Sequence, residues 1–506
     1  MMLRKLLFGY YCVALFQLIF LTGLFSVHIY AAISTYPAPQ ADFPASPFYK
    51  VTISQGKESR LGFVYLSRAR TEGPGAQFVE GRTLSYTGFM ATGIVTVEVE
   101  LLPNEQLNTA EVVIRPTRFS ISPTMFTERA VRFELSREGQ FVVEFGPEGY
   151  RHALIIAYDP WETNAPDLNC KDVKLIQADG KIDPAADLRE EHTLYFGSGV
   201  HDLGGRLDLP AGIKRVYLAP GAFVYGAFYI GHPDVVIDGR GVLCSGRLQH
   251  REAHSIETPP EAKRVIIEGI TVTDYAKFAI RTLGRDNVVR WVKCIGGWVY
   301  NADGLVGWAG TTLRHNFIHA DDDAVKLYDD HVLVEDCVIW QMTNGACLQL
   351  GWTSLAVRGV RVRNIDVVRA EWRSTGGANN SVINLRLASG TASGNTQSDF
   401  LFENIFVETP VDRLLDLRFT GKKNDMIDGG PHRLQDFCFR NIHARMKAPA
   451  TSYTGNLFQP YNEQYGYRNI RFENLYINGI HITGNNYREA GYFKIPDEVR
   501  GEISFF

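Results

Sequence analysis

A short four-residue unit recurs through the second half of the chain, and its spacing constrains the fold more than any other feature. In each copy a charged residue or histidine is followed by Asn or a substitute and then an apolar residue. Neighbouring copies begin 20 to 28 residues apart as far as Val362–Ile365, and further apart beyond it. The copies are Ile267–Ile270, Val292–Ile295, Arg314–Phe317, Val334–Cys337, Val362–Ile365, Phe402–Ile405, Phe439–Ile442 and Phe472–Leu475. Short strands at this period, with no amphipathic helix between them, predict a right-handed parallel β-helix.

Two other architectures fit less well. A second β-sandwich would need hairpin turns, and the regular period argues against them. Leucine-rich repeats have a similar period, but their Leu-x-x-Leu-x-Leu signature is absent from the sequence. In a β-helix, equivalent residues of neighbouring coils stack about 4.8 Å apart. Asparagines that recur at one position can then form a hydrogen-bonded ladder. This is the role expected for Asn316, Asn364, Asn404, Asn441 and Asn474.

The first third of the chain has a different pattern. Short runs such as Gly93–Leu102 and Gln140–Gly146 alternate apolar and polar residues and are separated by Gly, Pro and Asn. This alternation is typical of an antiparallel β-sandwich. The expected domains are therefore a β-sandwich at 33–165, a linker at 166–190, the β-helix at 191–485 and a C-terminal tail at 486–506.

The N-terminal 32 residues resemble a secretory signal. Arg4 and Lys5 precede an apolar run from Leu6 to Val27, which is long enough that an uncleaved membrane anchor stays open as an alternative. Either reading places the remaining chain outside the cytoplasm, secreted or periplasmic. The net charge is −4 and no basic block is present, which argues against a nucleic-acid partner.

The cysteines and the single glycosylation sequon say less about function than the repeats do. No Cys-x-x-Cys pair is present, which argues against a zinc site. Cys294 and Cys337 lie in apolar runs and are expected to be buried thiols, although an oxidising compartment would allow a disulfide. Asn379-Asn380-Ser381 is a possible glycosylation site.

Four aspartates stand out because like charges repel. Asp321, Asp322 and Asp323 are consecutive, and Asp303 precedes them by about one repeat, so the acids are expected to be neighbours on successive coils. Calcium binding would require further oxygen ligands, and no EF-hand or RTX pattern occurs. Acid–base chemistry needs carboxyl groups with different pKa values, and repulsion raises the pKa of one of them. The cluster therefore favours glycoside hydrolysis, without a metal or organic cofactor.

The geometry of the run is left open by the sequence. In a strand Asp321 and Asp323 would share a face, but a bulge or turn would change that. Trp308 and Trp352 are candidates for stacking on sugar rings, whereas Trp298 and Trp340 are expected to pack between coils.

The segment also resembles a known family. The motif runs "DGLVGWAGTTLRHNFIHADDDAVKLY", then "VIWQMTNGACLQLGW", and "VYLAPGAFVYGAF" and "GRGVLCSG" lie upstream of it. Together they resemble glycoside hydrolase family 49, the dextranase and isopullulanase family, over about residues 190–370. The family's layout implies an all-β fold, with a β-sandwich followed by a pectate-lyase-like β-helix.

The resemblance implies a role for each matching residue. Asp322 matches the general acid, and Asp303 and Asp323 match the two carboxylates that hold and activate water. The remaining matches, expected to bind substrate, are Lys326, Tyr328, Gln349 and Trp352, with Trp308 as the sugar-stacking candidate. The chain departs from the family at Asp321, where Asn is expected, and at Leu350, where an aromatic residue is expected.

The leading hypothesis is therefore a secreted, inverting endo-glycosidase that acts as a monomer on a polysaccharide with α-1,6-glucosidic bonds. A polygalacturonase would carry a Gly-His-Gly and an Arg-Ile-Lys motif, and this chain has Thr343–Cys347 and no Arg-Ile-Lys. Pullulan or an arabinan stays open as the substrate. A non-catalytic carbohydrate-binding β-helix would have no reason to keep three aspartates in register, and a lyase would act on uronates.

Overall fold

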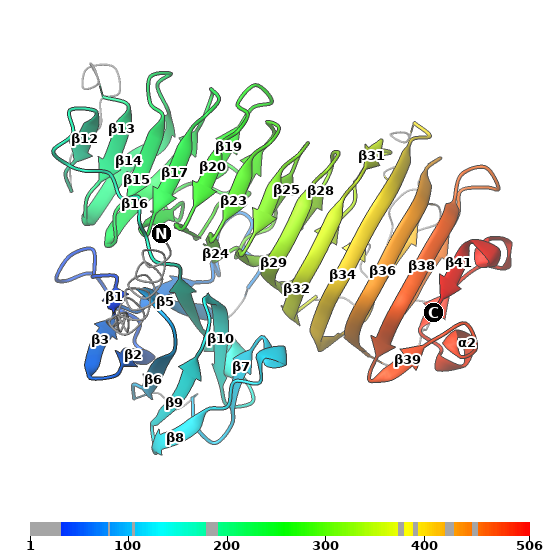
Figure 1. Ribbon diagram of the computed structural model, residues 1–506, viewed down its shortest axis with the longest axis horizontal. Helices are drawn as coiled ribbons and strands as arrows, with labels where there is room; N and C mark the ends of the chain where they lie inside the picture. The colour runs from blue at the N-terminus through cyan, green and yellow to red at the C-terminus, as the bar shows by residue number, and fades with distance from the viewer. Residues whose placement is uncertain are drawn as a thin grey trace, which may run out of the picture.

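Two all-β parts make up the protein, a sandwich near the N-terminus and a long parallel β-helix (Figure 1). The computed structural model describes residues 32–78, 81–103, 107–178, 191–372, 379–387, 393–419, 430–447 and 454–506. The predicted fold class is confirmed. Apart from Ala32, the expected signal or anchor lies outside these ranges. Within them, no helix is long and apolar enough to cross a membrane.

The sandwich consists of two sheets that face each other across a shared apolar core. One sheet comprises β1 (Ile33–Thr35), β4 (Tyr65–Arg68), β5 (Thr83–Ala91), β7 (Val112–Arg115), β10 (Gly139–Phe145) and β11 (Leu154–Asp159). The other comprises β2 (Tyr49–Gln55), β3 (Glu58–Gly62), β6 (Val95–Leu101), β8 (Thr124–Thr127) and β9 (Ala130–Leu135). All pairs are antiparallel except β5 with β11. Alternate residues of β6 are buried, as the period-two sequence pattern predicts.

Within the described residues, thirty strands form the continuous sheet of the β-helix. Its first coils contain β12 (Val173–Ile176), β13 (Thr193–Phe196), β14 (Gly199–Asp208), β15 (Arg215–Leu218), β16 (Ala222–Tyr229), β17 (Val236–Gly239), β18 (Val242–Cys244), β19 (Ile256–Thr258), β20 (Ile266–Glu268), β21 (Thr271–Thr273), β22 (Ile280–Thr282), β23 (Val288–Arg290) and β24 (Lys293–Ile295). The central coils contain β25 (Leu305–Gly307), β26 (Thr312–Arg314), β27 (Phe317–Ala320), β28 (Val325–Leu327), β29 (Leu333–Gln341), β30 (Leu348–Gln349), β31 (Val357–Arg358), β32 (Arg361–Ala370) and β33 (Ile383–Asn384). The last coils contain β34 (Thr396–Val411), β35 (Leu415–Arg418), β36 (Arg433–Met446), β37 (Asn456–Gln459), β38 (Tyr467–Ile477), β39 (Ile480–Ile482), β40 (Phe493–Lys494) and β41 (Ile503–Phe505).

Helical structure in the described ranges is confined to short segments. They are η1 (Thr117–Phe119), η2 (Gly149–His152), α2 (Tyr487–Ala490) and η3 (Asp497–Glu502). The coils are therefore held together by strand pairing and by the apolar side chains that fill their interior.

A sharp bend between two faces of each coil explains the recurring four-residue unit. One residue per coil has a positive φ of 52–78° at this bend. These residues are Gly269, Trp291, His315, Asp336, Asn364, Asn404, Asn441 and Asn474. Asparagine tolerates this left-handed conformation better than most residues do, which accounts for its recurrence.

The expected asparagine ladder forms over part of the β-helix. Nδ2 of Asn364 donates to Oδ1 of Asp336 at 3.0 Å. Asn404 donates in the same way to Asn364 at 2.9 Å, and Asn441 donates to Asn404 at 2.5 Å. Asn474 has the same backbone conformation on the next coil.

Asn316 does not belong to this ladder, and the prediction for it was wrong. It follows the bend residue His315 by one position and points into the coil interior. There its Oδ1 accepts from the backbone N–H of Val292, and its Nδ2 donates to the carbonyl of Val289, both at 3.0 Å. At the bend itself the rings of Trp291 and His315 stack, with centroids 4.5 Å apart.

The ends of the β-helix lie beyond the expected boundaries. Strand β12 falls inside the expected linker, yet it pairs in parallel with β13. Strands β40 and β41 fall inside the expected tail, yet they pair with β37 and β38. The Phe505 ring stacks on Phe472 with centroids 4.8 Å apart, so the last segment closes the final coil.

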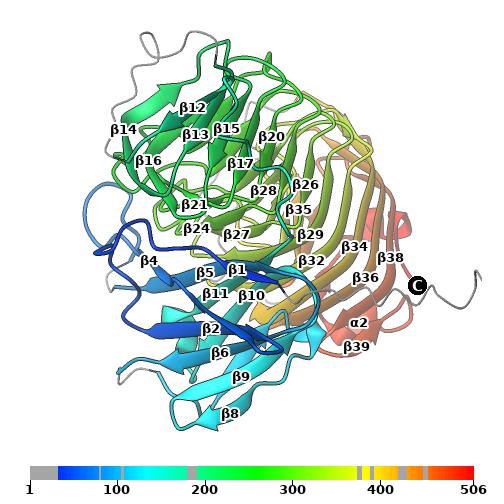
Figure 2. The same cartoon turned by 60° about the vertical axis from the view of Figure 1, so that its left-hand side comes forward.

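The sandwich packs against the face of the β-helix that carries β24, β27, β29 and β32 (Figure 2). Trp298 and Trp340 are 2% and 0% exposed and pack in this interface with the sandwich, where packing between coils was expected. Asp159 of β11 and Lys293 of β24 form a buried ion pair at 3.0 Å. Loss of either partner would leave an uncompensated buried charge, so the pair helps to hold the sandwich against the β-helix.

Candidate active site

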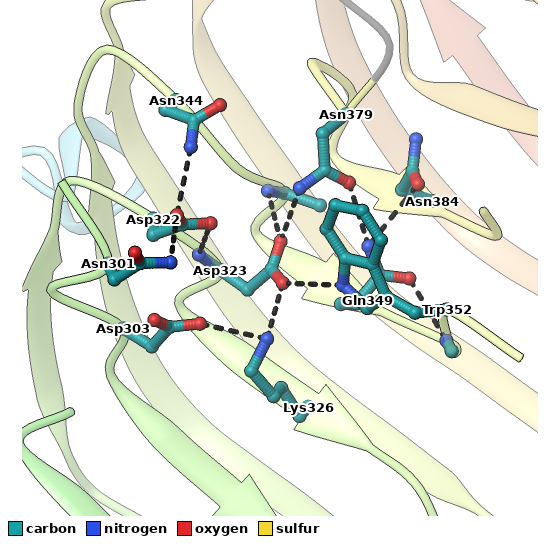
Figure 3. Close-up of polar contacts among 12 residues, drawn as sticks. Asn301, Asp303, Asp322, Asp323, Lys326, Asn344, Gln349, Trp352, Asn379 and Asn384 are labelled. Atoms are coloured by element: carbon teal, nitrogen blue, oxygen red, sulfur yellow. Dashed lines mark hydrogen bonds and ion pairs between the residues drawn. The ribbon is translucent and has the colours of Figure 1, made fainter. Parts of the chain in front are cut away.

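Three of the four aspartates lie together on the neighbouring face of the β-helix (Figure 3). Asp303 precedes β25, and Asp322 and Asp323 precede β28 on the next coil. Strands β25 and β28 pair in parallel with Leu305 opposite Val325, so equivalent residues of the two coils are adjacent. One carboxyl oxygen from each acid lies within 4.8 Å of the other two.

Two glycines allow the coils to approach this closely. A Cβ atom on Gly304 would overlap the carbonyl of Ala324, and one on Gly345 would overlap the main chain of Asp322. Gly345 also has a φ of 80°, which disfavours other residues. The Asp-Gly and Asn-Gly pairs of the sequence motif therefore have a steric role as well as a chemical one.

Asp323 is held as an ionised carboxylate by four donors. Its Oδ1 accepts from the backbone N–H of Ala346 at 3.0 Å and from Asn379 Nδ2 at 2.9 Å. Its Oδ2 accepts from Trp352 Nε1 at 3.2 Å and from Lys326 Nζ. Burial opposes ionisation, but the Lys326 charge and these hydrogen bonds outweigh it and hold the pKa of Asp323 below its ordinary value.

Asp322 is the opposite case, a buried acid with a raised pKa. Its Oδ2 accepts from Asn344 Nδ2 at 2.9 Å and more weakly from Asn301 Nδ2 at 3.4 Å. Its Oδ1 accepts from the backbone N–H of Asp323 at 2.9 Å. Burial and the neighbouring Asp323 charge raise the pKa of Asp322 to about 7. The two adjacent aspartates therefore differ in protonation near neutral pH.

Asp303 completes the cluster through Lys326. The Lys326 ammonium lies 2.8 Å from Asp303 Oδ2 and also contacts Asp323, so one cation joins the two acids. Asp303 is 3% exposed, and burial raises its pKa against the pull of Lys326. No described residue donates a hydrogen bond to its Oδ1. Asp303 therefore keeps one oxygen available as a proton acceptor, which Asp323 does not.

The three clustered aspartates could also be considered as ligands for a metal ion. Asp303, Asp322 and Asp323 are close enough to offer one ligand atom each to an ion. Lys326 already places a positive charge between two of them, and the Asp323 oxygens are engaged by four donors. The donor set therefore fits proton transfer better than it fits a divalent cation.

Asp321 lies apart from this cluster and has a different function. It is fully buried, and its Oδ1 accepts from the backbone N–H of Thr343 at 2.9 Å and from the Thr343 hydroxyl at 2.6 Å. Thr343 precedes Asn344, which donates to Asp322. The first aspartate of the run, Asp321, thus fixes the turn that orients Asp322.

We expect Asp321→Asn to lower activity only modestly and to shift its pH dependence. Asparagine keeps an oxygen for Thr343, so the turn is retained. The Asp321 charge adds to the raised pKa of Asp322, although burial and Asp323 contribute more. Its removal should therefore move the alkaline limb of kcat/KM to lower pH, which a pH–rate profile measures. A shift to higher pH would contradict this role.

The residues expected to bind substrate differ in how far they are exposed and in what they contact. Trp352 and Tyr328 border the cluster: Trp352 donates to Asp323, and the Tyr328 ring centroid lies 5.5 Å from Lys326 Nζ. Trp308 follows β25 and is half-buried, so part of its ring is open to solvent. Lys326 is 6% exposed, and its ammonium group pairs with Asp303 and Asp323.

Gln349 differs from its expected role. It is fully buried, its Nε2 donates to Asn379 Oδ1 at 2.8 Å, and its Oε1 accepts from the backbone N–H of Gly351 at 3.0 Å. It therefore orients Asn379, which in turn binds Asp323, and a contact with substrate is not available to it.

Sequence reasoning missed the amide side chains around the acids. Asn301 and Asn344 bind Asp322, and neither was given a role from the sequence, although Asn344 lies inside the motif and Asn301 lies just before it. Gln341 donates to the carbonyls of Asp322 and Asn344 at 2.8 and 2.5 Å and so ties the two turns together. The sequence marked Asn379 only as a glycosylation site. In the structure Asn379 is 3% exposed and its Nδ2 donates to Asp323, so its side chain is not presented to solvent.

The six cysteines in the described part of the chain are free thiols. Cys294 and Cys337 are buried as expected, and Cys170 is exposed.

Comparison with known proteins gives similarities over most of the chain. It is 26% identical over 420 residues to a dextranase from Arthrobacter sp. (strain CB-8), covering 67% of this chain and 65% of that enzyme. It is 25% identical over 402 residues to an isopullulanase from Aspergillus niger, covering 70% and 66%. The chain thus spans just under two-thirds of the length of these relatives.

No family model matches the sequence. The solved structure of Dex49A from Penicillium minioluteum has the same fold, with a TM-score of 0.78 at 18% identity, covering 94% of this chain and 96% of that one. These similarities confirm the resemblance of the chain to glycoside hydrolase family 49, the dextranase and isopullulanase family.

Proposed function

We propose that the protein is a secreted, inverting endo-glycoside hydrolase that cleaves α-1,6-glucosidic bonds in a dextran-like polysaccharide. The observation that carries the proposal is the difference between two adjacent acids: Asp322 has a pKa of about 7 while Asp323 is held ionised. Carboxyl groups with separated pKa values are what acid–base hydrolysis of a glycosidic bond requires. The similarity to named dextranases supports dextran as the substrate.

Asp322 is the proton donor in this mechanism. Protonated Asp322 gives its proton to the glycosidic oxygen as the bond to the anomeric carbon breaks, so the leaving sugar departs as a neutral alcohol. Asn344 and Asn301 hold the carboxyl group in place through Oδ2. The charge that Asp322 acquires is then adjacent to Asp323, which favours its reprotonation for the next cycle.

A water molecule attacks the anomeric carbon and loses its proton to Asp303. Asp303 suits this role because Oδ1 receives no hydrogen bond from a described residue and because its raised pKa makes it the stronger base. Asp323 is the fixed anion that orients the water and stabilises positive charge at the anomeric carbon. Lys326 joins the two carboxylates and sets their separation.

The spacing of the acids does not by itself favour inversion. One oxygen of each acid lies within 4.8 Å of the others, which is closer than the roughly 6.5–9.5 Å typical of inverting pairs. What supports inversion is the presence of two carboxylates beside the acid, since a retaining enzyme needs only one. The anomeric form of the first product therefore provides the decisive test.

The acid roles predict a bell-shaped pH dependence of kcat/KM. Asp322 must be protonated, so activity should fall as the pH rises through about 7. Asp303 must be ionised, and because burial raises its pKa, the acid limb should lie above the ordinary aspartate range. A profile that stays flat from pH 6 to 9 would contradict the assignment of Asp322.

A substrate panel tests the function itself. Dextran, pullulan, polygalacturonate and arabinan should be incubated separately with the protein, and new reducing ends followed with time. Dextran should be cleaved fastest, and mixed oligosaccharides should appear early if the action is endo. Preferred cleavage of pullulan would favour the isopullulanase-like alternative, to which the chain is also similar. Cleavage of polygalacturonate alone would overturn a neutral glucan as the substrate.

Secretion forms a separate part of the proposal. It is supported by the apolar run from Leu6 to Val27, and N-terminal sequencing of protein recovered from the culture medium tests it.

A further inference from the structure

A buried arginine that the catalytic scheme does not use lies beside the cluster. Arg386 follows β33, one coil after Trp352, and its backbone N–H donates to the carbonyl of Gly351 at 3.0 Å. Its side chain stacks on the Trp352 indole, with the guanidinium carbon 4.2 Å from the ring centroid. Trp352 in turn donates to Asp323, so Arg386 is one side chain away from the catalytic acids.

The guanidinium of Arg386 is nearly buried but has no partner. The residue is 8% exposed, and no described residue accepts a hydrogen bond or ion pair from its side chain. None of its nitrogens is both unpaired and fully buried, so they are in contact with solvent. Other buried arginines are paired: Arg82 binds Glu371, and Arg240 donates to backbone carbonyls. A guanidinium carries five donors, and those of Arg386 that reach solvent are free to bind an acceptor on a ligand.

Charge decides which ligand the site suits. In the state that the mechanism needs, Asp322 is protonated and Asp303 and Asp323 are ionised. Lys326 and Arg386 then offset the charges of Asp303 and Asp323, and no positive charge is left over to receive a further anion. A uronate carboxylate would add an unbalanced negative charge next to Asp323, whereas sugar hydroxyls would not.

We propose that Arg386 is a substrate-binding residue that donates hydrogen bonds to hydroxyl oxygens of the sugar unit next to the scissile bond, and that it favours a neutral glucan over a uronate polymer. The inference rests on the proposed function and deepens it. Stacking on Trp352 holds the planar guanidinium rigidly, so little side-chain entropy is lost when the sugar binds.

Binding to an inactive enzyme tests the proposal without turnover. In the full chain carrying Asp322→Asn, isomaltohexaose, a neutral α-1,6-linked oligosaccharide, should be titrated calorimetrically with and without Arg386→Met. The loss of hydrogen bonds to a charged donor should raise Kd about 10- to 150-fold. Arg386→Lys keeps the charge but not the planar pair of donors, and its Kd should lie between the two. Arg285→Met, which removes an arginine with a 66% exposed side chain elsewhere on the β-helix, should bind like the parent.

Each outcome has a definite meaning. An unchanged Kd for Arg386→Met, in a variant whose melting temperature matches the parent, overturns the proposal. If Arg386→Met melts early, Arg386→Lys decides: parental affinity there also overturns it. Binding of tetragalacturonate that depends on Arg386 would make the residue a carboxylate receptor and reject the neutral class. A wild-type protein that does not cleave dextran would instead overturn the proposed function, and this inference with it.

Discussion

Replacing Asp322 by asparagine is expected to lower kcat on dextran by about 10²–10⁴-fold, the usual contribution of a general acid. Asparagine has the same shape, and its single oxygen can still accept from the backbone N–H of Asp323. Its NH2 group replaces the oxygen that accepts from Asn344, and it cannot protonate the glycosidic oxygen. KM should change little, because the sugar contacts remain. The variant should be as stable as the parent or more so, since a buried acid beside Asp323 has been neutralised.

Steady-state kinetics and a thermal melt measure both parts of this prediction. Asp286→Asn is a matched control, because Asp286 is an exposed acid on the same β-helix and pairs with exposed Arg285. A fully active Asp322→Asn enzyme would show that another group supplies the proton. A substrate with a good leaving group, such as a nitrophenyl glycoside, should recover part of the lost rate, because its departure needs less protonation.

Replacing Lys326 by methionine should affect both stability and activity. Lys326 is 6% exposed and neutralises two buried acids, Asp303 and Asp323. Removal of one partner from a buried ion pair leaves an uncompensated charge and typically costs about 3–5 kcal/mol in the free energy of unfolding. The pKa of both acids should rise, so that the base is protonated at neutral pH and kcat falls.

The wild type and Lys326→Met should also differ in how their free energy of unfolding changes with pH. In the wild type the pKa of Asp323 is lowered on folding, so its contribution to stability is present at neutral pH and is lost as the pH falls below its ordinary range. Without Lys326 that pKa lies higher in the folded state than in the unfolded one, so stability should instead fall as the pH rises. Urea unfolding at several pH values checks this, with exposed Lys263→Met as the control. Equal stability of Lys326→Met and wild type would contradict the role of Lys326.

The fold could be predicted from the sequence because the repeat reflects a backbone conformation that every coil needs at the same place. Each coil needs one residue with a positive φ at the bend, and asparagine meets that need at Asn364, Asn404 and Asn441. The same reasoning failed at Asn316, because the bend residue there is His315, and the shift of one position turns the side chain inward. The C-terminal segment has no such repeat, so its pairing with the last coil could not be inferred from it.

The candidate site could be predicted in part. The spacing between Asp303 and the aspartate run is close to one coil, which is why their proximity followed from the period alone. The separate role of Asp321 did not follow, because it depends on the turn after β27, where the strand alternation ends. Asn379 and Arg386 lie one or more coils further along, after loops of irregular length, so no period links them to the acids.

The anomeric configuration of the first product tests the central claim most directly. The protein should be mixed with dextran or isomaltohexaose, and proton NMR spectra recorded before mutarotation equilibrates the new reducing ends. Direct attack of water held by Asp303 and Asp323, on the face opposite the bond that Asp322 protonates, predicts that the β-anomer appears first and that the α-anomer grows in later. Initial release of the α-anomer would require a covalent intermediate on one of these carboxylates and would contradict the account.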